Sequence, residues 1–226
     1  MVDNLMQASP DFRELRCQHV AWQALHTTLS ADTGLTTAIL HPYQNTWQAL
    51  PQNPDDDTAH TDWLIHLFND LFADSNTRLV RGADEPEYFA ATHTAPAQIC
   101  FAHGYFASAL HEISHWCIAG KKRRQLDDFG YWYCPDGRDK LTQAQFEQVE
   151  IRPQAIECLL THATNRPFYV SADNLNASFD TSQSTFAHDV YIQARQFLHK
   201  PTSLPKDAKR LLLALYVLCQ DKPLSS

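Results

Sequence analysis

The stretch His111-Glu112-Ile113-Ser114-His115 places the strongest constraint on the fold and chemistry of this chain. It matches the pattern HExxH. Residues i and i+4 of an α-helix lie one above the other, so two imidazoles at this spacing can bind one metal ion. The flanking residues are mostly apolar, and Gly120 followed by four basic residues is typical of a helix C-terminus. We therefore predict a metal-binding helix over residues 105–119.

Bulk composition indicates a globular protein. The chain has 226 residues, of which 44% are hydrophobic and 19% charged, and its net charge is −8. The acidic balance argues against direct binding of nucleic acid, which needs a basic face. The sequence has no apolar run long enough to span a membrane, its first residues lack a secretory signal, and its six cysteines form no CxxC pair. We expect a cytoplasmic protein without a membrane span.

The spacing of apolar residues and a proline-rich polar stretch divide the chain into two parts. Residues 11–30 have helical spacing of apolar side chains, whereas residues 41–57 are polar and rich in proline, which is typical of a linker. We therefore interpret residues 1–57 as an N-terminal extension and linker, and residues 58–222 as a metal-dependent domain.

The second part alternates short strands with helices. Its apolar periodicity predicts helices over residues 63–72, 142–161, 183–199 and 204–219, and strands over residues 77–81, 87–90 and 98–101. Pro153 should kink or break the helix that contains it. The expected fold class is α+β and mostly helical, with a zincin-like HExxH helix packed against a second, acid-bearing helix and a small sheet.

A third metal ligand should come from another element, because no further histidine follows at the spacing HExxHxxGxxH. The helix over residues 142–161 carries three candidates, Glu147, Glu150 and Glu157. Glu150 lies beside apolar positions and is preferred, whereas Glu147 points further toward solvent. Glu157 is the geometric rival, because it lies about two turns beyond Glu150.

Four sequence runs carry a resemblance to a known family. They are the run from Phe101 to Leu110, HEISHWCIAGK at 111–121, RRQLDDFGYWYCPDGRD at 123–139 and QFEQVEIRPQA at 145–155. Over about residues 58–200 the chain resembles bacterial elongation factor P hydroxylases. The first 57 residues lie outside this resemblance.

The resemblance implies that the chain hydroxylates a lysine of translation elongation factor P that has already received a β-lysyl group. It also implies a non-haem centre with His111, His115 and Glu150 as ligands, Fe(II) as the metal and O2 as co-substrate. The sequence shows no HxD-plus-arginine pattern of a 2-oxoglutarate site, so the reductant is not identified. Glu112 is the candidate catalytic residue.

The loop over residues 127–139 joins the two ligand-bearing helices and is rich in aromatic and acidic residues. Its aromatic rings could surround a cationic lysyl chain and its carboxylates could pair with the amines. The candidate substrate-binding residues are Asp128, Tyr131, Tyr133, Asp136 and Arg138. The alternative interpretation is that the aromatic side chains only hold the loop against the domain.

Two other functions fit the same motif. A zinc-dependent HExxH hydrolase or peptidase would use the same three ligands, with Glu112 as general base for a water molecule. A non-enzymatic module that binds a translation factor would use the metal only for stability.

Overall fold

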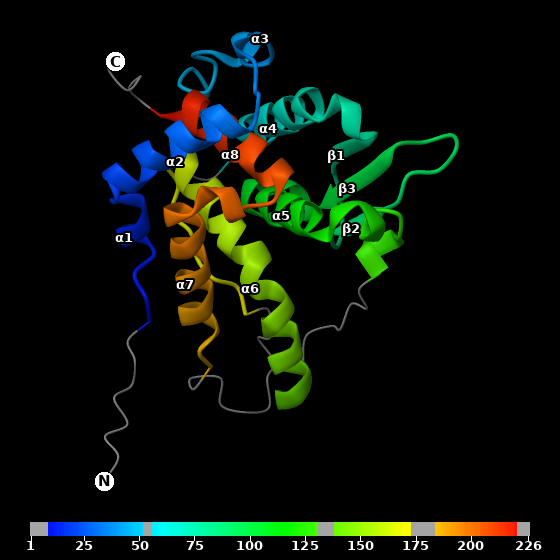
Figure 1. Ribbon diagram of the computed structural model, residues 1–226. Helices are drawn as coiled ribbons and strands as arrows, with labels where there is room; N and C mark the ends of the chain where they lie inside the picture. The colour runs from blue at the N-terminus through cyan, green and yellow to red at the C-terminus, as the bar shows by residue number, and fades with distance from the viewer. Residues whose placement is uncertain (1–8, 52–55, 131–137, 173–183, 221–226) are drawn as a thin grey trace.

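A computed structural model describes residues 9–51, 56–130, 138–172 and 184–220 (Figure 1). Helices dominate it, and a small sheet lies at one end. The helices are α1 (Arg13–Arg16), α2 (His19–Asp32), α3 (Thr37–Leu40), α4 (Thr58–Leu71), α5 (Phe106–Arg123), α6 (Lys140–Ala163), α7 (Phe186–His199) and α8 (Lys206–Cys219). Short 3-10 turns, η1 (His41–Tyr43), η2 (Ala73–Ser75), η3 (Ala102–Gly104), η4 (Asp127–Gly130) and η5 (Pro201–Ser203), connect them. The expected α+β, mostly helical class is confirmed, while the likeness to zincins stays a prediction.

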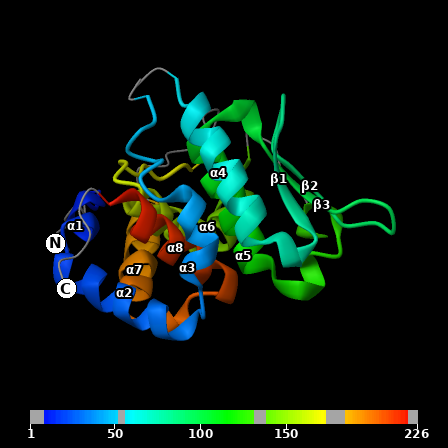
Figure 2. The same cartoon turned by 90° about the horizontal axis from the view of Figure 1, so that it is seen from above.

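The sheet has three strands in the order β1-β3-β2, where β1 spans Thr77–Arg81, β2 Glu87–Phe89 and β3 Ala97–Phe101. β1 runs parallel to β3 and β2 runs antiparallel to it. Alternate residues such as Leu79, Ile99 and Phe101 are buried, as the period of two predicts. Figures 1 and 2 agree that the sheet and the α1–α2–α7 group lie at opposite ends of the molecule.

α5 lies at the centre and packs against α4, α6, α8 and β3. Its buried side chains include Leu110, Ile113 and Trp116. Gly120 adopts φ 67°, in the left-handed region, and a Cβ there would meet no other atom within 4 Å. Backbone conformation alone therefore favours glycine at this position, and it ends the regular helix where the sequence predicted.

α6 is the longest helix in the described residues, with 24 residues, or about 36 Å. It continues without a break through the buried Pro153, so the predicted break is wrong. Proline removes the hydrogen bond to the carbonyl four residues earlier. That carbonyl belongs to Val149, a 47% exposed residue on the solvent-facing side of α6.

The N-terminal part shares the main hydrophobic core. Leu15, Trp22 and Leu25 are buried in the same cluster as the side chains of α5 to α8. Residues 41–50 contain η1 and the buried Tyr43 and Trp47, so they are packed rather than extended as a linker would be. The proposed boundary at residue 57 stays a prediction. Among the described residues, no helix has both the length and the apolar character needed to cross a bilayer.

His162 on α6 gives the fold a pH-dependent stability. It is 2% exposed, and burial together with the charge of Arg16 lowers its pKa from 6.5 to about 4. The unfolded chain therefore takes up this proton at higher pH than the folded chain does. The contribution of His162 to the free energy of unfolding is complete above about pH 6.5. It falls by about 2 kcal/mol on acidification to about pH 5.

Denaturant unfolding at pH 7.5 and pH 5, with a chelator present, measures this difference. Between pH 7.5 and pH 5, the free energy of unfolding of the wild type should fall by about 2 kcal/mol more than that of His162→Gln. Equal losses would mean that His162 does not stay neutral in the folded protein.

Candidate metal centre

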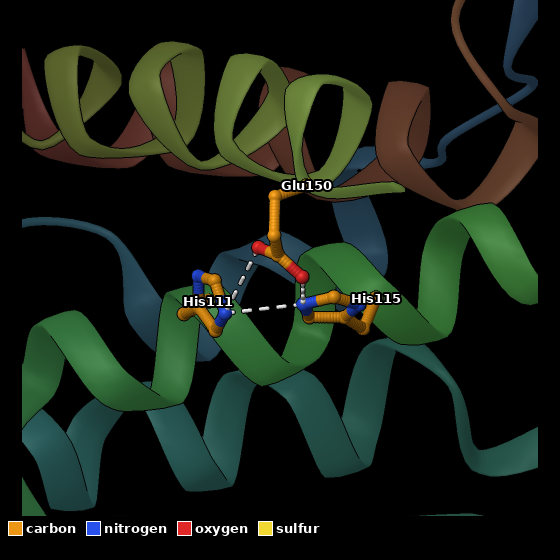
Figure 3. Close-up of side chains that lie close together, drawn as sticks. All are labelled: His111, His115 and Glu150. Atoms are coloured by element: carbon orange, nitrogen blue, oxygen red, sulfur yellow. Dashed lines mark hydrogen bonds and ion pairs between the residues drawn. The ribbon is translucent and has the colours of Figure 1, made fainter. Parts of the chain in front are cut away.

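α5 and α6 bring the three candidate ligand side chains together (Figure 3). His111 and His115 project from adjacent turns of α5, and Glu150 reaches them from α6. The two Nε2 atoms lie 3.1 Å apart. Glu150 Oε1 lies 3.2 Å from His115 Nε2, and Glu150 Oε2 lies 3.6 Å from His111 Nε2.

These distances fit a single cation. One potential ligand atom from each of the three residues lies within 4.8 Å of the other two. Ligand atoms about 2.1 Å from one ion would stand about 3.0–3.4 Å apart, which is close to the observed spacing. The side chains of His111 and His115 are 27% and 18% exposed and that of Glu150 only 6%. The cluster could therefore hold a metal ion that still has a face open to solvent.

Two further α6 side chains form hydrogen bonds with the candidate ligands. His111 Nδ1 lies 2.8 Å from Glu157 Oε2. When Nδ1 donates this hydrogen bond, the lone pair of Nε2 is left for a metal. Gln154 Nε2 donates to Glu150 Oε2 at 3.4 Å and to the carbonyl of Ser171 at 2.7 Å. The sequence indicated Glu157 only as a rival ligand, although its spacing of seven residues from Glu150 places both glutamates on one face of the helix.

The site carries an excess of negative charge. Burial opposes protonation of His111, but Glu157, Glu150 and Glu112 outweigh it and raise the pKa of the imidazole. Burial likewise opposes ionisation of Glu150, but His115 and His111 lower the pKa of its carboxyl. Burial raises the pKa of Glu112, and the two imidazoles partly offset this. A divalent cation would neutralise this cluster more fully than a single proton on His111 does.

The structure describes two of the five predicted substrate-binding residues. The Asp128 carboxylate accepts the backbone N–H of Tyr88 at 2.9 Å and so ties η4 to β2. Asp127 does the same for Ala90 at 2.8 Å. Both acids thus satisfy backbone donors on the outer edge of the sheet. Contact between Asp128 and a substrate stays a prediction.

Arg138 lies two residues before the first residue of α6 and is 3% exposed. Its guanidinium stacks 3.8 Å from the centre of the Phe146 ring, and its Nε donates to Gln143 Oε1 at 2.9 Å. These contacts join the start of α6 to the segment around Ala172, whose carbonyl accepts from Arg138 Nη2 at 3.4 Å. The other three predicted residues, Tyr131, Tyr133 and Asp136, lie outside the described residues.

Comparison with known proteins identifies the family. The family model of elongation factor P hydroxylase matches residues 67–226. An elongation factor P lysine hydroxylase of Haemophilus influenzae is 48% identical over 154 residues, which are 67% of this chain and 85% of the relative. The matched region contains the sheet, α5 to α8 and the three clustered side chains, whereas α1, α2 and α3 lie outside the family match. The chain belongs to the elongation factor P hydroxylase family.

Proposed function

We propose that this chain hydroxylates a lysine of elongation factor P with a metal ion held by His111, His115 and Glu150. The family match and the name of the relative support the reaction and the substrate. The convergence of two imidazoles and one carboxylate in a half-open cluster supports the metal centre, and this observation carries the proposal. The modified group is the lysine that already carries a β-lysyl arm, as the sequence resemblance implies.

The ligand set favours iron. Two imidazoles and one carboxylate with open positions are typical of non-haem Fe(II) oxygenases. Bound here, Fe(II) would activate O2, the oxidant that places one oxygen atom in a C–H bond, which no side chain can do. The second oxygen atom leaves as water and takes two protons and two electrons from a separate reductant. The chain's own groups then have positioning roles: Glu157 holds the His111 ring, and Gln154 holds the Glu150 carboxylate.

Charge at the site suits a cationic substrate. Three carboxylates, those of Glu112, Glu150 and Glu157, act on the imidazole of His111, so with all three ionised the site keeps net negative charge even when a divalent ion is bound. An extended lysyl amine approaching this site would be attracted rather than repelled. Glu112 is half-buried beside both ligands, and burial raises the pKa of its carboxyl. We assign it the role of holding or releasing a proton at that carboxyl during the reaction.

The zinc hydrolase alternative places a different demand on Glu112, because there the carboxylate must accept a proton from the attacking water. Metal content and turnover of protein purified without oxygen separate the two functions. Iron with oxygen uptake in the presence of modified elongation factor P supports the hydroxylase. Zinc with peptidase turnover that Glu112→Gln abolishes supports the hydrolase.

Mass spectrometry of elongation factor P tests the proposed reaction. Peptides that carry the β-lysylated lysine should gain the mass of one oxygen atom in cells with this protein, and His111→Ala should abolish the gain because it removes a ligand. His66→Ala is the matched control, since His66 is an exposed residue of α4 that bonds its own helix at the Asp62 carbonyl. An unchanged gain in His111→Ala cells would contradict the proposal.

Metal titration tests the role of Glu157. Loss of a carboxylate that orients a metal-bound imidazole lowers affinity about 10–100-fold, so Glu157→Ala should weaken Fe(II) binding by this factor. Glu147→Ala is the control, because Glu147 lies on the same helix but bonds Gln143 and Ser184. Equal affinity of Glu157→Ala and the wild type would show that the Glu157–His111 contact does not act on the metal.

A further inference from the structure

We infer that three residues of the N-terminal segment (residues 9–51 and 56–57), namely Phe12, Arg16 and Asp57, position Glu150 for metal binding through the chain that follows α6. This inference rests on the proposed metal centre. The N-terminal segment precedes the family match, which begins at residue 67. Its contacts nevertheless lead, step by step, to a side chain that holds Glu150.

The connecting element is residues 164–172, here named the return segment. Asn165 adopts φ 64°, in the left-handed region, and the backbone N–H of Arg166 bonds the carbonyl of Thr161 at 3.2 Å. The chain therefore turns back at the end of α6. It runs along that helix until the carbonyl of Ala172 accepts a hydrogen bond from Gln143 Nε2 at 3.1 Å. The return segment thus covers α6 from its C-terminus to beyond the level of Glu150.

The N-terminal segment contacts the early part of the return segment. The Phe12 ring packs edge-on against Phe168 with centroids 5.1 Å apart, and both residues are buried. Arg16 Nη1 donates to the carbonyl of Asn165 at 3.0 Å.

A second contact comes from the residue just before α4. Asp57 forms an ion pair with Arg166 at 2.8 Å. The Arg166 guanidinium in turn stacks 4.3 Å from the ring centre of Phe106, the first residue of α5. The return segment is therefore fixed against both the N-terminal segment and the helix that carries His111.

The late part of the return segment reaches the metal ligand through one side chain. The Gln154 amide is bonded at both ends to Ser171, since Nε2 donates to the Ser171 carbonyl at 2.7 Å and Oε1 accepts the Ser171 N–H at 3.1 Å. The same Nε2 donates to Glu150 Oε2. Gln154 is 1% exposed, so it has little room to adopt another position. Any shift of Ser171 is therefore transmitted to the donor that holds the Glu150 carboxylate.

A positioning role and a purely structural role make different predictions. If Phe12 and Arg16 only add stability, their loss lowers the melting temperature and leaves the metal affinity of the folded protein unchanged. If they position Glu150, their loss also weakens metal binding, and the effect requires Gln154.

A double-mutant cycle on the full chain tests this, with Co(II) alone as the probe and titrations well below the unfolding temperature. Gln154→Ala should weaken Co(II) binding about 10-fold, as loss of a ligand's hydrogen-bond partner does. Phe12→Ala should weaken it several-fold, and Phe12→Leu should restore it. The double variant should bind Co(II) no more weakly than Gln154→Ala, because that substitution already removes the side chain that connects Ser171 with Glu150.

Leu29→Ala is the matched control for lost stability. Leu29 is fully buried in α2, which packs on α7, α8 and η5. This variant should melt at a lower temperature and bind Co(II) like the wild type. Unchanged affinity in Phe12→Ala, or additive effects of Phe12→Ala and Gln154→Ala, would overturn the inference. Failure of His111→Ala to weaken binding would instead overturn the metal centre itself.

A milder pair of variants covers the case in which Phe12→Ala does not fold. Arg16→Gln removes the bond to the Asn165 carbonyl, and Arg13→Gln removes the same charge from the same helix. The Arg13 side chain is 81% exposed and pairs with Asp11. The inference predicts weaker Co(II) binding for Arg16→Gln than for Arg13→Gln, and equal binding would count against it.

Discussion

The contact between α5 and α6 is the constraint on which the site depends. Helix geometry alone places His111 above His115, but only the packing of α6 brings a carboxylate to both imidazoles. A shift of α6 by one turn would move Glu150 by about 5 Å and out of reach of any shared ion. The sheet and α4 support α5, and α7 and α8 pack on α6, so the surrounding fold serves to hold this register.

The packing of α6 against α5 carries an electrostatic free-energy cost, because it brings acidic side chains together. Burying the carboxylates of Glu112, Glu150 and Glu157 together is unfavourable unless positive charge compensates them. Without a metal, the imidazole of His111 supplies some of that charge, and the pKa of His111 rises accordingly. A bound divalent ion would replace that proton, so metal binding, proton release and folding stability are linked at this cluster.

The sequence alone predicted the elements that have strong local patterns. The strand over residues 77–81 follows from its alternation, and the helix around His111 follows from its apolar flanks and Gly120. Glu150 could be preferred because one helical face carried both the apolar residues and the acid. Of the two outcomes predicted at Pro153, a kink or a break, the break is wrong, because the packing of α6 against α5, α7 and α8 holds the helix through the loss of one backbone hydrogen bond. Other features depend on contacts between positions far apart in sequence. These are the packing of residues 41–50, the two hydrogen bonds between Gln154 and Ser171, and the hydrogen bond from Tyr88 of β2 to Asp128. No local pattern carries such information.

Anomalous diffraction at the iron edge, from crystals grown with Fe(II) in the absence of oxygen, locates the metal relative to His111, His115 and Glu150. We expect one strong peak about 2.0–2.3 Å from His111 Nε2, His115 Nε2 and a carboxylate oxygen of Glu150, with Glu157 still bonded to His111 Nδ1. A peak at another place, or one coordinated by Glu157 in place of Glu150, would contradict it.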